Sequence, residues 1–409
     1  MEEYRRAYKI FEFFKYGFLA LMPILSIYNG ISFINLGSLL LLGIMITEII
    51  IKKGSFDINA NLFIIIVFLA VLNIVIGFIH MNVISLTGYL HNSIAMFLVA
   101  VICAYFVKNT IVKKEVFYQY IKIIALASSF FLFVQYYFYS KGIVLYGFLP
   151  FAGIDLLKDY ASISISYGRP NSFFLEPAHF AIYVLPVYAI SLFKHQYITS
   201  IILLLALILS TSSTGIITVI TVTLIFIAKE KRIPVIFKWI FVLAGLIVVL
   251  KFIPLTYQSI IFRKISFASL KQNIRLFGAF EFFKYFTVKE LLLGVGVNQI
   301  SSYMTIIANL NVSNYSNAFF FSFLSFGILG GTIWTSYIIS LYNLSRNKML
   351  YIVFILIYFT DQILFNRNLV YLLLILFVFS DNEDDLIKNI GLRNKDENKK
   401  ISKECFSNS

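Results

Sequence analysis

Charge is scarce in this chain. Only 13% of its 409 residues are Asp, Glu, Lys or Arg, whereas 60% are hydrophobic and the mean hydropathy is +0.86. A soluble domain carries about twice that charged fraction, so the composition excludes a soluble enzyme with a single anchor. Apolar runs recur from residue 10 to residue 380. We therefore predict an all-α polytopic membrane protein in which residues 1–380 form one transmembrane domain.

Cysteine and histidine are also rare. The two cysteines are Cys103, within an apolar run, and Cys405, in the polar tail, and there are four histidines. Two such distant cysteines exclude a disulfide framework and a cysteine-based metal site. No cluster of Asp, Glu or His has the spacing of metal ligands. We therefore predict no metal and no cofactor.

The positions of the positive charges predict how the chain is oriented in the membrane. The formal net charge is +14, but most Lys and Arg lie in short loops between apolar runs, where membrane topology places them. We therefore predict no nucleic acid partner. With the N-terminus inside, the inner loops hold most of these bases and the short outer turns hold only Arg367. Both termini are thus predicted to be cytoplasmic, with residues 381–409 as a disordered tail.

Span positions follow from length, because a helix needs about 20 apolar residues to cross a bilayer. We predict about twelve spans, near residues 10–28, 32–51, 60–79, 88–107, 118–139, 174–193, 197–211, 214–228, 235–254, 318–343, 349–365 and 368–380. The pair within 197–228 is short. Helices of about 15 residues reach roughly 22 Å, against a hydrocarbon core of about 30 Å. This pair either crosses twice or re-enters.

Two long outer loops remain, near residues 140–173 and 255–317. The second loop carries more bases than acids, which goes against the usual charge bias of outer loops and suggests an anionic partner. Its bases are Arg263, Lys264, Lys271, Arg275, Lys284 and Lys289, and its acids are Glu281 and Glu290.

A second clue is the segment 169–179, which reads Arg-Pro-Asn-Ser-Phe-Phe-Leu-Glu-Pro-Ala-His. It puts a guanidinium, a carboxylate and an imidazole at the start of an apolar run, where ionisable groups are costly and indicate a site. Pro177 suits a first helical turn, so the alternative for Glu176 is a simple helix cap. His179 taken alone is more typical of a structural or polar-packing residue than of a site residue.

Glycines mark a third region. The Gly-Val-Gly at residues 294–296 lacks the strand and third glycine of a dinucleotide fingerprint, and it predicts a tight turn. Gly327, Gly330 and Gly331 predict close helix contact.

At these residues the chain resembles the Wzy-type O-antigen and capsular polysaccharide polymerases and, more distantly, the O-antigen ligases. Such proteins tend to share an Arg before a Phe-rich segment ending in Glu-Pro, a hydroxyl-rich turn between short helices, a basic outer loop before a Gly-x-Gly turn, and a Gly-Ile-x-Gly helix start. Here these features are carried by Arg169, Phe173, Phe174, Glu176, Pro177, Ser210 to Gly215, Arg275, Gly294, Gly296, Gly327, Ile328 and Gly330. The hydroxyl-rich turn lacks the Arg that it often carries in that family. Ser316 precedes Asn317 where a His is frequent, which favours polymerase over ligase.

The resemblance implies a metal-independent glycosyltransferase of the bacterial plasma (inner) membrane, with its active site facing outward. It would transfer a growing glycan from undecaprenyl pyrophosphate to a new undecaprenyl-pyrophosphate-linked repeat unit, making O-antigen of lipopolysaccharide or capsule. Membrane lipid and a chain-length regulator protein are further expected partners. An O-antigen ligase and a lipid-linked oligosaccharide flippase remain as alternatives.

The resemblance also assigns roles to residues. Arg169 and Arg275 would clamp pyrophosphate, since a planar guanidinium binds oxyanions in bidentate fashion. Glu176 would orient Arg169 or accept the proton of the acceptor hydroxyl. Secondary substrate contacts are expected at Asn171, His179, Arg263, Lys264, Lys271 and Asn317.

Overall fold

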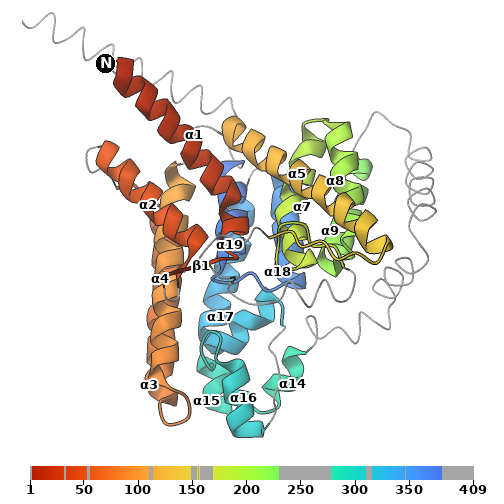
Figure 1. Cartoon of the computed structure of the whole chain (residues 1–409). Helices are drawn as coiled ribbons and strands as arrows, with labels where there is room; N and C mark the ends of the chain where they lie inside the picture. The colour runs from red at the N-terminus through yellow and green to blue at the C-terminus, as the bar shows by residue number, and fades with distance from the viewer. Residues whose placement is uncertain are drawn as a thin grey trace, which may run out of the picture.

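The computed structural model describes residues 2–31, 34–52, 56–109, 114–148, 154, 156, 169–229, 278–309, 316–345 and 347–379. These residues are mostly helical (Figure 1). The helices are α1 (Glu2–Leu25), α2 (Leu36–Ile51), α3 (Ala60–His80), α4 (Leu86–Asn109), α5 (Lys114–Ser140), α7 (Pro177–Phe193), α8 (Tyr197–Leu209), α9 (Ser213–Lys229), α14 (Ala279–Phe283), α15 (Val288–Leu293), α16 (Ile300–Ala308), α17 (Ala318–Leu344), α18 (Lys348–Thr360) and α19 (Arg367–Val378). The strands β1 (Asn29–Ile31) and β2 (Ile34–Asn35) pair antiparallel.

The prediction of a helical membrane protein is confirmed at this level. Among the described residues, four helices are long and apolar enough to cross a membrane, namely α3, α4, α5 and α17, and six shorter helices are apolar. Every predicted span except 235–254, which lies outside the described residues, overlaps a helix. The total of about twelve membrane spans remains a prediction.

Asparagine side chains begin many of these helices. Asn35, Asn59, Asn317, Asn347 and Asn366 each occupy an N-cap position and accept a hydrogen bond from a backbone N–H of the first turn. A first-turn N–H has no partner within its own helix, and an Asn cap satisfies it locally. Each of these caps therefore fixes the residue at which its helix begins.

The packing centre is α7, which is buried along nearly its whole length. It contacts α5, α8, α9, α18 and α19, and these helices surround it in Figure 1. The pair α8 and α9 is separated at Ser210 to Ser212, where Thr211 has a positive φ of 55°. The chain therefore breaks at the hydroxyl-rich turn, as the sequence predicts.

A buried ion pair joins the first two helices. Nζ of Lys15 on α1 and of Lys52 each lie 2.7 Å from Oε1 of Glu48 on α2, and Lys15 and Glu48 are almost fully buried. A buried charge without a partner is strongly destabilising. The two lysines therefore explain how Glu48 can lie inside an apolar helix pair.

The long helix α17 is two segments joined at Gly327, whose φ of 61° and ψ of −163° are not helical. Its backbone lies against the end of α15, so a Cβ added there would be 2.3 Å from the carbonyl carbon of Leu292. Gly330 likewise lies against Leu72 and Leu69 of α3. The predicted close helix contacts at these glycines are therefore confirmed, with a break that the apolar run did not reveal.

Candidate functional site

Several helix ends meet at one place, which we call the helix-end junction. They are the end of α1, the start of α7, the turn between α8 and α9, the start of α17, and the link between α18 and α19. The orientation predicted from the loop charges would place all of these ends on the same, outer side of the membrane. The side chains that make the junction are Arg169, Glu176, His179, Thr211, Thr214, Asn317, Asp361 and Arg367.

Hydrogen bonds to α5 fix the segment before α7. The Oε1 atom of Gln135 accepts from the backbone N–H of Asn171 at 3.2 Å and of Ser172 at 2.7 Å. The Ser172 hydroxyl donates to the Ser128 carbonyl oxygen at 2.7 Å. Asn171 is 1% exposed, and its amide donates to the Leu175 carbonyl oxygen at 3.2 Å. The structure therefore places Asn171, a predicted substrate contact, inside the scaffold of the segment.

Aromatic contacts add to this anchoring. The ring of Phe173 stacks on Phe131 of α5 with centroids 4.7 Å apart, and Phe174 packs against Tyr183 of α7 at 5.4 Å. Such ring pairs stabilise beyond their buried area by about 0.5–1.5 kcal/mol. The two phenylalanines thus hold the charged ends of the segment in place.

Arg169 reaches the hydroxyl-rich turn. Its Nε donates to Oγ1 of Thr211 at 3.2 Å and its Nη2 donates to the Thr211 carbonyl oxygen at 3.3 Å. Thr211 is fully buried. The guanidinium is therefore oriented by a neutral turn that lies 42 positions further along the chain.

Glu176 occupies the N-cap position of α7 and Pro177 follows it, as predicted, but its side chain makes no capping hydrogen bond. The simple cap therefore does not account for this carboxylate. It interacts electrostatically with Arg367, the first residue of α19. Glu176 thus lies between the predicted segment and a charged helix start elsewhere in the chain.

Arg367 ties three elements together. Its Nη1 donates to the Ser26 carbonyl oxygen at 3.0 Å, and its Nη2 lies 3.3 Å from Nδ1 of His179. A guanidinium can only donate, so Nδ1 of His179 is the acceptor in this contact. His179 is thereby a polar contact of the junction and not a pure packing residue.

Asp361 and Asn317 complete the junction. The Thr214 hydroxyl donates to Oδ2 of Asp361 at 3.2 Å, and the Asp361 carbonyl oxygen accepts from the backbone N–H of Ala318 at 2.8 Å. Asn317 is buried, caps α17 through Oδ1 and donates to the Phe359 carbonyl oxygen at 2.8 Å. The predicted substrate contact Asn317 therefore also joins α17 to the end of α18.

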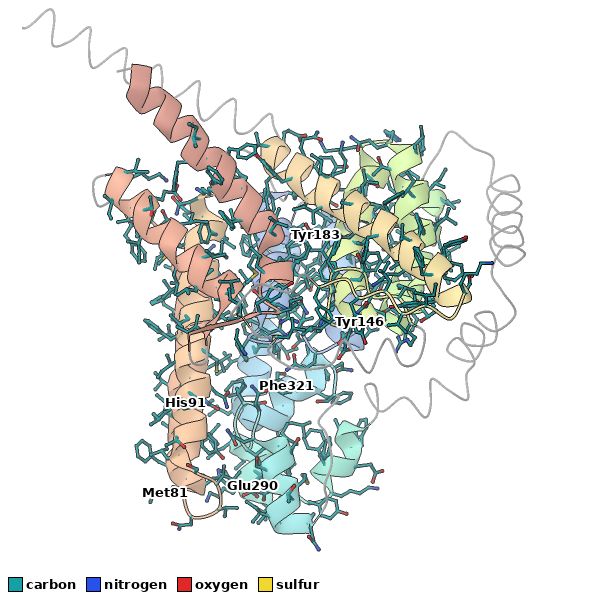
Figure 2. All side chains as sticks on the ribbon, viewed as in Figure 1. Met81, His91, Tyr146, Tyr183, Glu290 and Phe321 are labelled. Carbon is teal, nitrogen blue, oxygen red and sulfur yellow. The ribbon has the colours of Figure 1, made fainter. Side chains whose placement is uncertain are left out.

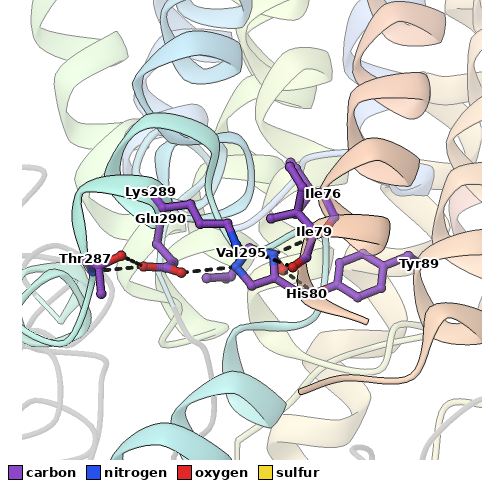
Figure 3. Close-up of polar contacts among 8 residues, drawn as sticks. All are labelled: Ile76, Ile79, His80, Tyr89, Thr287, Lys289, Glu290 and Val295. Atoms are coloured by element: carbon purple, nitrogen blue, oxygen red, sulfur yellow. Dashed lines mark hydrogen bonds and ion pairs between the residues drawn. The ribbon is translucent and has the colours of Figure 1, made fainter. Parts of the chain in front are cut away.

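Part of the outer loop is attached to the α3–α4 hairpin at the far end of the molecule, where Figure 2 shows Met81 and Glu290 at the same level. Oε1 of Glu290 lies 3.2 Å from Nε2 of His80, and Nδ1 of His80 lies 3.1 Å from the Ile76 carbonyl oxygen. Oε2 of Glu290 accepts from the backbone and hydroxyl of Thr287 (Figure 3). We call this contact the His80–Glu290 latch.

The latch depends on the charge of Glu290. Burial raises the pKa of the Glu290 carboxyl, but hydrogen bonds from Thr287 and His80 outweigh it and hold that pKa below 4.5. Glu290 is therefore a carboxylate at neutral pH. Both ring nitrogens of His80 lie within hydrogen-bonding distance of an oxygen, one of the Glu290 carboxylate and one of the Ile76 carbonyl.

The glycine turn after α15 strengthens this attachment. Gly294 and Gly296 have positive φ values of 78° and 89°, which confirms the predicted tight turn. The backbone N–H of Val297 donates to Oδ1 of Asn73 at 2.8 Å, and the Tyr89 hydroxyl donates to the Val295 carbonyl oxygen at 3.0 Å. The turn therefore binds the outer loop to both α3 and α4.

Acidification is expected to release the latch. Because the pKa of Glu290 is lower in the folded state than its usual 4.5, the stabilisation is complete above pH 4.5 and is lost as the pH falls through the folded value. Spin labels at Met81→Cys and Val288→Cys, which replace exposed residues, in a Cys405→Ser background should give a narrow distance distribution at pH 7 and a broad one well below pH 4.5.

Two matched variants test whether the Glu290 carboxylate is what keeps the distance distribution narrow. Glu290→Gln should broaden the distribution already at pH 7, because loss of a charged hydrogen bond costs about 2 kcal/mol. Glu281→Gln removes an exposed carboxylate paired with Lys284 and should leave the distribution narrow. A narrow distribution for Glu290→Gln at pH 7 would contradict the latch.

The structure brings together only part of the predicted site. Arg169, Glu176 and His179 lie at the helix-end junction with Asn317. Asn171 is buried in the scaffold of the segment before α7. Four predicted site residues lie outside the described residues and stay predictions, namely Arg263, Lys264, Lys271 and Arg275. Sequence reasoning left out Arg367 and Asp361 as site residues, although Arg367 was the one base in the short outer turns, which is a usable signal.

Comparison with known proteins adds no identification. No family model, curated protein or solved structure matches this chain. Within the described part of the chain, no three His, Cys, Asp or Glu side chains are grouped so that they could hold a metal ion. The class that the fold defines is therefore a helical protein with helices long and apolar enough to cross a membrane, and with a charged junction between helix ends.

Proposed function

We propose that this protein is a membrane glycosyltransferase that polymerises lipid-linked repeat units into a surface polysaccharide. The donor would be a growing glycan on undecaprenyl pyrophosphate, and the acceptor a new repeat unit on a second undecaprenyl pyrophosphate. The observation that carries the proposal is the helix-end junction, where Arg367 of α19 interacts with Glu176 and His179 at the start of α7. Arg169, which precedes α7, is held there by Thr211 between α8 and α9. Groups held in this way can act on a developing anion without reorganising.

In this mechanism an acceptor hydroxyl oxygen attacks the anomeric carbon of the donor. The bond from that carbon to pyrophosphate breaks, and the lipid pyrophosphate leaves with the electron pair. Arg169, with Arg275 from the basic outer loop, would neutralise the growing charge on the leaving group. Glu176 would accept the proton of the acceptor hydroxyl or orient a guanidinium, and it must reach that hydroxyl to act as a base.

The test is the length distribution of the surface glycan. Cells that lack the protein should produce a single repeat unit where complemented cells produce a ladder on a gel. An unchanged ladder would contradict polymerase activity. Long chains that accumulate on the lipid would indicate a ligase instead, and repeat units that stay on the inner face would indicate a flippase.

A further inference from the structure

A cavity lies at the opposite ends of the helices that form the junction. It has a volume of about 190 Å³ and is lined by Phe193, His195, Phe226, Lys229 and Met349. These residues come from the end of α7 and its link to α8, the end of α9 and the start of α18. The loop charges assign these ends to the cytoplasmic side. None of these residues belongs to the candidate site.

One side of the cavity is apolar. The rings of Phe193 and Phe226 meet edge to face at 6.4 Å, and Met349 is 2% exposed. Phe193 remains 41% exposed. The neighbouring surface of α8 continues this apolar character with three exposed side chains, those of Tyr197, Ile198 and Ile201. A ligand with hydrocarbon chains could therefore extend from the cavity along α8.

The other side is basic. Lys229, in the last turn of α9, has no hydrogen bond or ion pair among the described residues. Nδ1 of His195 lies 3.0 Å from the Tyr197 hydroxyl. Nearby, Nζ of Lys194 pairs with Glu115 at 2.7 Å and Nζ of Lys348 lies over the ring of Tyr342. Lys229 is thus an exposed cation at the cavity.

We propose that this cavity binds an anionic glycerophospholipid of the inner leaflet, with its phosphate on Lys229 and the start of its chains against Phe193 and Phe226. Free phosphate would gain nothing from the phenyl rings, and a neutral lipid would gain nothing from the lysine. The volume is below the roughly 300–1,000 Å³ of pockets for drug-sized ligands, so it fits a headgroup region while the chains lie outside.

Native mass spectrometry of the purified full-length protein tests this assignment. The protein is titrated with phosphatidylglycerol, with phosphatidylcholine and with glycerol phosphate, which has no acyl chains. Wild type should retain one tightly bound phosphatidylglycerol in preference to the other two. Lys229→Gln should weaken its binding about fivefold, since a basic residue near an anionic surface contributes about that factor. Lys229→Arg should retain it.

Two further variants test whether binding depends on the position of the lysine and on the phenyl rings. Lys108→Gln removes an exposed lysine in the last turn of α4, away from the cavity lining, and should bind like wild type. Phe226→Ala should weaken the binding of phosphatidylglycerol without affecting the binding of glycerol phosphate. Equal retention of phosphatidylcholine, preference for glycerol phosphate, or a loss that Lys108→Gln shares with Lys229→Gln would overturn the proposal.

Discussion

Arg169→Ala is expected to reduce glycan elongation by about 10²- to 10³-fold, the usual loss when one preorganised donor to a developing negative charge is removed. Cells that carry this variant should therefore show glycan shortened to a single repeat unit on a gel, with protein levels preserved. Arg169→Lys keeps the charge but loses the planar fork, so a short ladder is expected. The predicted partner Arg275 should behave like Arg169 when replaced by Ala.

Thr211→Val tests whether Arg169 acts on the substrate or only stabilises the turn between α8 and α9. Thr211 accepts from Arg169 through both its hydroxyl and its carbonyl oxygen. Valine removes only the hydroxyl, and it keeps the branched shape that this turn already accommodates. If Arg169 acts on substrate, Thr211→Val should keep most of the ladder, and Lys108→Ala should keep all of it. If Thr211→Val shortens the glycan as much as Arg169→Ala, the arginine merely holds the turn.

Gly327→Ala is expected to destabilise the protein by roughly 2–6 kcal/mol. The backbone conformation at Gly327 is open essentially to glycine alone and costs other residues about 1–3 kcal/mol. The added methyl group would meet the backbone of Leu292, which cannot rotate away, and such overpacking costs about 1–3 kcal/mol more. The melting temperature of the detergent-purified protein should fall sharply, or the monodisperse species should be lost.

Two other glycines serve as matched controls. A Cβ at Gly43 in α2 meets nothing within 4 Å, so Gly43→Ala should be neutral or stabilise by up to about 1 kcal/mol through helix propensity. Gly142 has a φ of 74° with open space around it, so Gly142→Ala carries backbone strain alone, about 1–2 kcal/mol. If Gly327→Ala is no worse than Gly142→Ala, the contact of α17 with α15 is not tight.

Much of the helical framework could be read from the sequence. The runs near 60–79 and 88–107 predict helices that the structure gives as α3 and α4, because an apolar run of that length marks a helix wherever it packs. The hydroxyl-rich turn also predicted the break between α8 and α9. The hydropathy did not reveal the break inside α17, because the flanking runs are continuous in hydropathy and the close approach of Leu292 requires the conformation of Gly327. The one signal for it was the Gly-Ile-x-Gly helix start that the resemblance assigned to Gly327.

The candidate site, like the fold, could be predicted from the sequence only in part. The segment 169–179 stands out in the sequence because three ionisable side chain types are costly at a membrane surface. The role of Glu176 cannot be read from the sequence. Its N-cap position depends on neighbouring residues, but its interaction with Arg367 depends on the packing of distant helices. Likewise, Asn171 and Asn317 have residue types that suit substrate binding, yet their burial among backbone partners emerges only from packing.

The sequence by itself determined the class of protein, the positions of most helices and the segment where the charged groups begin. These follow from hydrophobicity and capping, which are properties of neighbouring residues and add up along the chain. Only the tertiary structure decided that Arg367 meets His179, 188 positions away, and that Glu290 meets His80, 210 positions away. Contacts of that separation depend on how whole helices pack, because no local pattern specifies which helix ends share a face.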